Sequence, residues 1–340
     1  MKNKNVVVVL HVYKGRDGHR LAHMYFSEFL RLLQSKKLDI SVYVFCYGFT
    51  REEENFVKSL FQTIDGRVIK FSFEFQKLVY SEVPTLREII KLSKIYNPDD
   101  LMIYFHSKGA SYSDQNYYIN WGLYASATLA AALDHIAENS MLIDRYHSIG
   151  PFAGLGVFDR FGTLTPAYSG NFWLTKVKNF YQKDLTKKWY SDAFHNRHHA
   201  EALLGLDAHA NLLLNLEDNY NFRAVDLPDL QKIYDKIKIE LGILSTTKSD
   251  QLAFVDSYIK SFYDHLIVQQ KRYSEKRIFW KFRRFIFGNK SILRYSSFFS
   301  KALDRLVPWS QCELYRHYSG PKQFSVLNDC IATSTYINER

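Results

Sequence analysis

The hydrophobic pattern of the first hundred residues alternates between that of a buried strand and that of an amphipathic helix. Residues 6–12 form an almost unbroken apolar, largely β-branched run, as expected for a strand that is covered on both faces. Residues 25–33 place large apolar side chains three and four positions apart, which is the spacing of one helix face. The same alternation predicts further strands at 40–45, 67–73 and 101–105 and further helices at 52–61 and 84–96.

This order of elements predicts an α/β fold with a doubly wound, mostly parallel sheet, because strands that are separated by helices pair in parallel. After these elements the pattern predicts an Ala-rich helix at 117–139 and a Gly-rich loop at 148–165. It then predicts a short strand at 172–176 and a segment at 194–216 that is helical at its start. From about residue 230 onward the pattern is helical, over 230–241, 250–270 and a basic segment that reaches residue 306.

A boundary is predicted near residues 242–249, where Gly, Ser and Thr follow the helical pattern. We therefore expect residues 1–245 to form the α/β domain and residues 246–340 to form a helical C-terminal extension rich in basic and aromatic residues. The chain has 340 residues, of which 46% are hydrophobic, so a sizeable core can be buried.

The positive charge of the chain is concentrated in one segment. Residues 271–305 contain eleven Lys and Arg residues and two acidic residues, so they carry +9 of the formal net charge of +10. A uniformly basic nucleic-acid binder would not be divided in this way, and we expect no nucleic-acid partner. Because Phe, Trp and Ile are interleaved with the basic residues, the segment is expected to bind an anionic membrane surface.

The cysteines and the N-terminal run indicate a cytoplasmic protein. Three cysteines, Cys46, Cys312 and Cys330, make no disulfide framework, which favours a reducing compartment. The apolar run at 6–12 is too short for a signal peptide and reads better as a strand, and no stretch of about 18 apolar residues is present. We therefore expect a cytoplasmic protein that is peripheral at the inner membrane face.

The first candidate site is His106-Ser107-Lys108-Gly109, directly after the fourth expected strand. Ligands of open parallel sheets bind beyond the carboxyl ends of the strands, where Lys108 and His106 can meet a diphosphate. Gly109 lets the backbone approach the ligand closely. The alternative is an ordinary polar exit from a strand.

The second candidate site is Ser169-Gly170-Asn171-Phe172-Trp173, a turn of small residues that runs into two aromatic rings. The Asn171 amide can donate and accept hydrogen bonds with sugar hydroxyls, and the Trp173 ring can stack on a pyranose. Phe172 is expected to be a core residue.

The third candidate is a cluster of histidines and acids around His195, His198, His199 and Glu201, followed by Asp207. His198 and Glu201 are three residues apart and share one face of a helix, where a carboxylate can act as a general base. The histidines could instead bind a metal or be solvated, and their spacing matches no strong zinc motif. A weaker candidate is the first strand and the turn after it, where His11, Arg16 and Asp17 would meet a nucleotide.

These segments, in this order, resemble a group of bacterial polysaccharide-biosynthesis glycosyltransferases of the GT-A type, including rhamnan-synthesis-like ones. Members have a His-Ser/Thr-Lys segment after a central strand, then Ser-Gly-Asn-Phe-Trp, and later Arg-x-x-x-Glu in a helix. In this chain the first motif is at residues 106–108, the second is at residues 169–173, and the third is formed by Arg197 and Glu201. The resemblance covers roughly residues 5–225.

The resemblance implies transfer of a sugar from a nucleotide-sugar donor to a growing glycan or a lipid-linked acceptor, as in capsule or lipopolysaccharide synthesis. Lys108 and His106 would stabilise the leaving diphosphate, and Glu201 would be the general base if the enzyme inverts. The residues expected to bind donor or acceptor are His11, Arg16, Asp17, Ser107, Gly109, Ser169, Gly170, Asn171, Trp173 and Asp207.

The chain departs from many GT-A enzymes in one respect, because it has no Asp-x-Asp motif to hold a divalent cation. Asp99 and Asp100 precede the fourth strand and so lie at its wrong end. Lys108 can supply the positive charge that Mn²⁺ or Mg²⁺ would supply to the diphosphate, so no metal is assigned. Two other functions remain open, a metal-dependent hydrolase that uses the histidine cluster and a nucleic-acid binder that uses the basic segment.

Overall fold

The protein was analysed as a computed structural model, which describes residues 5–33, 38–62, 69–74, 82–107, 115–146, 148–151, 153–158, 164–168, 172–181, 211–214 and 226–246. The predicted helical start of 194–216, and all of the predicted C-terminal extension after residue 246, lie outside the described residues.

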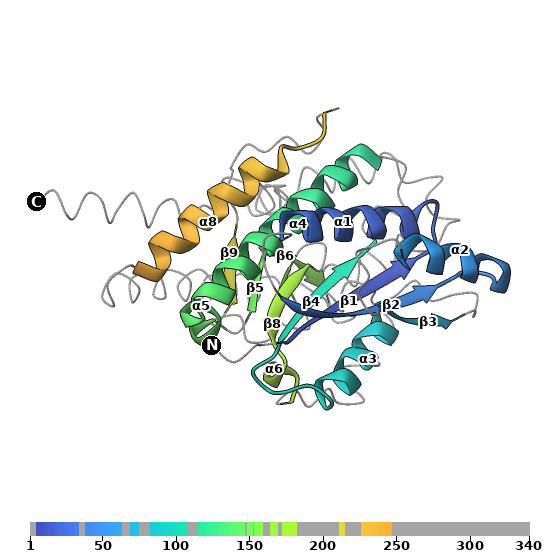
Figure 1. The fold of residues 1–340 in the computed structure, drawn as a ribbon, viewed down its shortest axis with the longest axis horizontal. Helices are drawn as coiled ribbons and strands as arrows, with labels where there is room; N and C mark the ends of the chain where they lie inside the picture. The colour runs from blue at the N-terminus through green and yellow to red at the C-terminus, as the bar shows by residue number, and fades with distance from the viewer. Residues whose placement is uncertain are drawn as a thin grey trace, which may run out of the picture.

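A seven-stranded sheet runs through the centre of the molecule in the order β3-β2-β1-β4-β8-β5-β9 (Figure 1). All neighbouring strands are parallel except β8, which is antiparallel to both β4 and β5. The strands are β1 (Asn5–Tyr13), β2 (Asp39–Tyr47), β3 (Ile69–Glu74), β4 (Leu101–His106), β5 (Ser148–Pro151), β8 (Trp173–Lys176) and β9 (Asn211–Leu214). The predicted α/β class and the doubly wound, mostly parallel sheet are confirmed.

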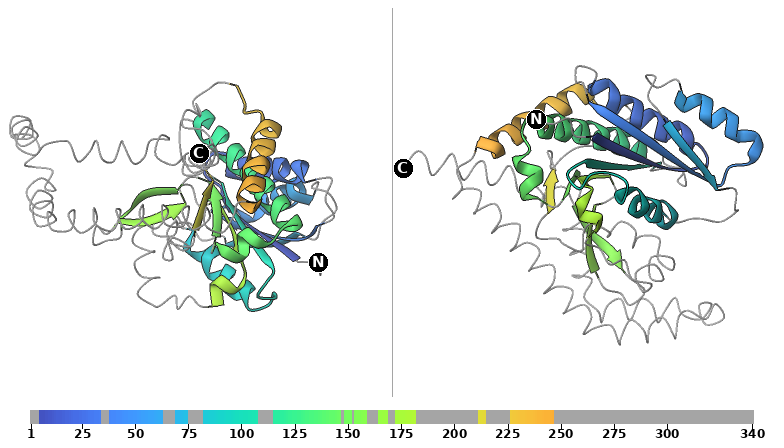
Figure 2. Two further views of the ribbon diagram at one scale, coloured as in Figure 1. Left: turned by 90° about the vertical axis from the view of Figure 1, so that its left-hand side faces the viewer. Right: turned by 60° about the horizontal axis from the view of Figure 1, so that its bottom comes forward.

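Helices cover both faces of this sheet (Figures 1 and 2). One face carries α1 (Gly18–Leu32), α2 (Arg51–Gln62), α4 (Gln115–Glu138) and α8 (Leu230–Thr246), and the other carries α3 (Val83–Ser93) and α6 (Lys178–Tyr181). The short helix α5 (Met141–Arg145) precedes β5. Because both faces are covered, the central strands are apolar along their length, and residues 6–10 of β1 are at most 1% exposed.

One predicted element differs from the structure. The stretch 148–165, expected to be a Gly-rich loop, contains β5 and the antiparallel hairpin β6 (Ala153–Phe158) and β7 (Leu164–Tyr168). Its short segments gain strand structure from pairing with other segments, which a local pattern does not report. The strand β9 at the sheet edge was not predicted, whereas the helical start expected for 194–216 lies outside the described residues.

The C-terminal helix α8 packs against α4, and polar side chains join the two helices. The buried Asp134 of α4 accepts hydrogen bonds from Tyr234 and Lys238, and His135 Nε2 lies 2.6 Å from Ser245 Oγ. α8 continues through Gly242 to Thr246, so the helix predicted at 230–241 is longer than its pattern indicated. The domain boundary near 242–249 stays a prediction.

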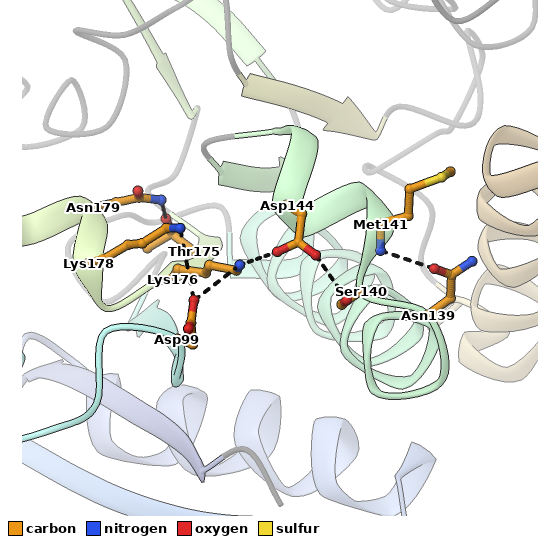
Figure 3. A network of polar contacts seen from close by, with 9 residues as sticks. All are labelled: Asp99, Asn139, Ser140, Met141, Asp144, Thr175, Lys176, Lys178 and Asn179. Carbon is orange, nitrogen blue, oxygen red and sulfur yellow. Dashed lines mark hydrogen bonds and ion pairs between the residues drawn. The ribbon is translucent and has the colours of Figure 1, made fainter. Parts of the chain in front are cut away.

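A buried lysine holds the amino-terminal edge of β4 to α5 (Figure 3). Lys176, whose side chain is 5% exposed, pairs with Asp144 of α5 and lies 3.4 Å from Asp99 Oδ1. The neighbouring Asp100 accepts backbone hydrogen bonds from Asn5 and Asn97. Asp99 and Asp100 are therefore structural residues, at the end of β4 opposite to His106.

None of the helices in the described ranges is long and apolar enough to cross a bilayer.

Candidate functional site

The order of the strands places a topological switch point between β1 and β4. The chain leaves β1 to build β2 and β3 on one side, and then returns to build β4 on the other side of β1. The connections on the two sides diverge at the carboxyl ends of these two strands, and this is where open α/β sheets bind their ligands. The residues at the end of β1 and the end of β4 therefore define the candidate site.

Ser107 ties the ends of the two strands together. Its backbone N–H donates to the His11 carbonyl at 3.0 Å, and the Tyr13 backbone N–H donates to its Oγ at 2.9 Å. The side chain is buried, and its hydroxyl also lies 3.4 Å from the Tyr13 carbonyl oxygen. Ser107 thus lies where it was predicted, but its hydroxyl is used to fix the backbone from which Lys108 continues.

His11 supports the site from inside the protein. It is 4% exposed and stacks on Tyr47, with ring centroids 4.9 Å apart. The Thr85 hydroxyl donates to Tyr47 at 3.0 Å, so His11 Nδ1 is the donor in its own 2.7 Å hydrogen bond with Thr85 Oγ1. Burial lowers the pKa of His11 to about 3, and the ring is therefore neutral at physiological pH. The predicted contact of His11 with the donor is corrected to a structural role.

His106 lies beside His11 in the register of the parallel strands, at the last position of β4. Its Nδ1 is 3.8 Å from Oε1 of Glu82, and its ring is 5.5 Å from the ring of Phe172. Glu82 also accepts a 2.7 Å hydrogen bond from the Tyr104 hydroxyl. The side chain of His106 is 13% exposed, and its Nε2 atom is buried.

The loop between β1 and α1 contributes a second cation. Lys14 forms an ion pair with Glu53 of α2 at 2.7 Å, and its backbone N–H donates to the Tyr47 carbonyl. Gly15 has φ 43°, a left-handed conformation that glycine adopts without strain, and it turns the chain toward α1. Arg16 is exposed, and the Asp17 carboxylate makes a weak 3.9 Å contact with Arg20 on the described part of the chain.

Two helix amino termini face the same edge of the sheet. α1 follows β1 directly, and α3 brings Glu82 and Thr85 into contact with His106 and His11. The first turns of helices carry free N–H groups and partial positive charge, and they favour bound phosphate. The first turns of α1 and α3 therefore supply partial positive charge at this edge, where Lys14 and His106 lie beside the carboxylates of Glu53 and Glu82.

Trp173 does not offer a stacking platform. It is 1% exposed, its ring stacks on Tyr104 with centroids 5.2 Å apart, and Phe180 packs against it. A ring enclosed by these side chains cannot stack on a sugar, so its predicted ligand contact is corrected to a core role. Phe172 is fully buried, as expected for a core residue.

The remaining predicted residues lie outside the described part of the chain. They are Lys108, Gly109, Ser169, Gly170, Asn171, Glu201, Asp207 and the histidines around His198. Within the described ranges, no group of three or more His, Cys, Asp and Glu side chains is arranged to hold a metal ion.

Sequence reasoning missed Glu82, Thr85 and Lys14. The signal for Lys14 was its place after the first strand, next to the Gly15 turn. Glu82 had only a weak signal, an acidic residue just before the Val-Pro start of a helix. Its contact with His106 depends on how α3 packs on the sheet, which local sequence does not reveal.

The comparisons with known proteins do not identify the chain. The sequence matches no protein-family model and no curated protein. One similar solved structure is 4-diphosphocytidyl-2C-methyl-D-erythritol synthase, which is 12% identical with a TM-score of 0.32 and covers 69% of this chain and 99% of its own. Another is a provisionally named nucleotide-diphospho-sugar transferase from Desulfovibrio desulfuricans G20, 11% identical with a TM-score of 0.29, covering 62% of this chain and 79% of its own. Likenesses at this level carry no conclusion about function.

Proposed function

We propose that the protein is a glycosyltransferase that moves a sugar from a nucleotide-sugar donor to a growing surface polysaccharide, such as capsule or lipopolysaccharide. One observation supports the proposal above the others. The switch point between β1 and β4 brings His106 and Ser107 to the edge where α1 and α3 present their amino termini. An edge of this kind suits the diphosphate of a nucleotide sugar.

In this proposal the leaving diphosphate is stabilised by positive charge at the end of β4. The Lys108 ammonium and the His106 imidazole would neutralise negative charge as the bond between the sugar and the diphosphate breaks. Lys14, at the end of β1, would add a cation on the nucleotide side. No step needs a metal, because the chain lacks an Asp-x-Asp motif and Lys108 stands in the corresponding place.

The sugar and acceptor side of the site is assigned to Ser169, Gly170 and Asn171, which precede β8, and to Glu201 and Asp207. β8 begins at Trp173, which pairs with Tyr104 of β4, and the ring of the preceding Phe172 lies 5.5 Å from the ring of His106. Glu201 would act as the general base that deprotonates the acceptor hydroxyl if the reaction inverts the anomeric centre.

A peripheral attachment to the inner membrane face completes the proposal. The +9 segment 271–305 would bind anionic lipid, since each basic residue near such a surface contributes about 1 kcal/mol. A lipid-linked acceptor would be found there. Co-sedimentation with liposomes tests this part: binding should need anionic lipid, weaken with salt and be lost when 271–305 are deleted. Equal binding by the deleted protein would exclude it.

A thermal-shift screen of nucleotide sugars tests the donor class. A nucleotide sugar present at about 100 times its dissociation constant should stabilise the native state by about 2.7 kcal/mol. The matched control is the Lys14→Met variant, which removes the cation at the end of β1 and should need more ligand for the same shift. A screen in which no nucleotide sugar or nucleoside diphosphate shifts the unfolding temperature would contradict the proposal.

A further inference from the structure

Two histidines of α1 lie in its contact with α2, the helix beside it on the same face of the sheet (Figures 1 and 2). His19 and His23 are four residues apart, so they share one side of α1. The His19 ring packs edge-on against Phe49 and Phe56, with ring centroids 5.9 and 5.6 Å apart. The His23 ring packs in the same way against Phe61, at 5.6 Å. Because Phe56 and Phe61 belong to α2, the two imidazoles help to hold the helices together.

Each of these rings has one nitrogen that is closed off from water. His19 Nδ1 and His23 Nε2 are buried, and neither atom has a hydrogen-bond partner among the described residues. In a neutral imidazole one nitrogen carries no hydrogen, so that nitrogen can lie against apolar atoms without leaving an N–H group unpaired. In the protonated ring both nitrogens are donors, and a buried N–H group without an acceptor, on a charged ring, costs free energy. The contact therefore fits the neutral rings better than the charged rings.

The charges around the two rings do not compensate for this cost. Burial is the largest effect on both histidines, and it lowers the pKa of each. The charged groups that act on His19 are two cations, which lower its pKa further, and two carboxylates, which raise it: Arg20 and Lys14, and Asp17 and Glu53. On His23 the described residues exert one further effect, because the Leu60 backbone carbonyl raises its pKa by less than burial lowers it. Both rings are therefore neutral at physiological pH.

α2 is attached more weakly than the helix on which it packs. Two of its 12 residues are buried, against eight of the 15 residues of α1. Two of its acidic side chains pair with lysines, Glu54 with Lys58 in the same helix and Glu53 with Lys14 of the loop before α1. A helix with few buried residues opens at a low free energy, so a change at two ring contacts can shift its population.

We propose that His19 and His23 form a pH-responsive contact: as neutral rings they hold α2 against α1, and in acid their protonation releases α2 and withdraws Glu53 from Lys14. The folded-state pKa of each ring lies below its ordinary value of 6.5. The neutral rings therefore contribute stability that is present above that value and is lost as pH falls from it toward the lower pKa of the folded state. This contact is independent of the proposed transfer reaction, although Lys14 lies at the candidate site.

Hydrogen exchange of the α2 backbone amides, corrected for the intrinsic effect of pH, measures the release. The amides of the central strand β1 serve as the reference, because core strands open with the whole protein. From about pH 7.5 to about pH 5, the protection of α2 should fall about tenfold relative to that of β1. NMR titration of the two rings in the wild type should give midpoints below 6.5.

A double variant, His19→Phe with His23→Phe, keeps the ring contacts and removes both titrating groups, so its α2 should show no such fall in acid. The matched control is His135→Gln, which removes a histidine of α4 that contacts Ser245 and should leave the α2 response as in the wild type. An equal loss of α2 protection in the wild type and the double variant would overturn the proposal. The wild type alone decides it if the double variant folds poorly: either midpoint at or above 6.5, or an α2 protection that falls no more than that of β1, would also overturn it.

Discussion

Replacing Gly122 by alanine should destabilise the protein, although helix propensity alone predicts the opposite. Gly122 lies inside α4, where exchange of Gly for Ala normally stabilises a helix by about 1 kcal/mol. A Cβ added at Gly122 would lie 2.2 Å from Cζ of Tyr25 and within 2.5 Å of two further ring atoms. No real contact is this short, so the Tyr25 ring or one of the two helices would have to move.

The Tyr25 ring has little room to move. It is fully buried, it packs edge-on against Phe172, and its hydroxyl donates a 3.0 Å hydrogen bond to the Tyr118 carbonyl. Overpacking in a core costs about 1–3 kcal/mol, and loss of the hydrogen bond adds about 1 kcal/mol. After the gain in helix propensity is subtracted, the free energy of unfolding should fall by about 1–3 kcal/mol.

Calorimetry or denaturant unfolding measures this change directly. A loss of about 2 kcal/mol corresponds to a fall in the unfolding temperature of about 4–8 °C for a domain of this size. Gly242→Ala is the matched control, because the same substitution in α8 places its Cβ with nothing within 4 Å. The free energy of unfolding of that variant should rise by about 1 kcal/mol.

In a double-mutant cycle, Tyr25→Leu should remove most of the stability loss that Gly122→Ala causes. If Gly122→Ala were as stabilising as Gly242→Ala, the packing of α1 on α4 described above would be wrong.

Three further changes test other parts of the account. Lys176→Met should lower the free energy of unfolding by at most about 1 kcal/mol in chemical denaturation, because Asp144 and Asp99 are largely exposed and stay solvated without the lysine, and a loss of several kcal/mol would contradict this account of the network. Burial raises the pKa of Glu240 to about 7, so stability should fall as pH rises from about 4.5 to 7, and Glu240→Gln should raise the unfolding temperature more at pH 8 than at pH 5. Glu201→Gln should reduce turnover by about 100-fold with donor affinity changed only a few-fold, and near-normal turnover would move the base elsewhere, with Asp207 next.

The fold could be predicted from the sequence where a long apolar run made the element unambiguous. Residues 6–12 predicted β1 because a strand buried on both faces needs no polar alternation. Residues 148–165 were mispredicted because glycines interrupt the pattern of β6, whose strand structure comes from pairing with β7. The antiparallel direction of β8 was also beyond prediction, since a strand of four residues carries no signal of its direction.

The site could be predicted by position but not by role. The carboxyl end of β4 was found from sequence, and His106 and Ser107 do lie at the switch point. The side chains of His11 and Trp173 were assigned to a ligand because their chemistry suits one, yet both are closed off by residues distant in sequence. Burial is a property of the packed structure, so chemistry alone could not separate these residues from His106.

The most direct test of the transferase account is the release of nucleoside diphosphate from a nucleotide sugar, measured for the wild type and for Lys108→Ala in the presence of EDTA. Loss of one electrostatic group at the leaving diphosphate should cost about 2–4 kcal/mol in the transition state. The account predicts that the wild type stays active in EDTA and that Lys108→Ala folds normally but is about 30- to 1,000-fold slower. Activity that EDTA abolishes and manganese restores would contradict the metal-free site, and a wild type that releases no nucleoside diphosphate from any nucleotide sugar would contradict the account as a whole.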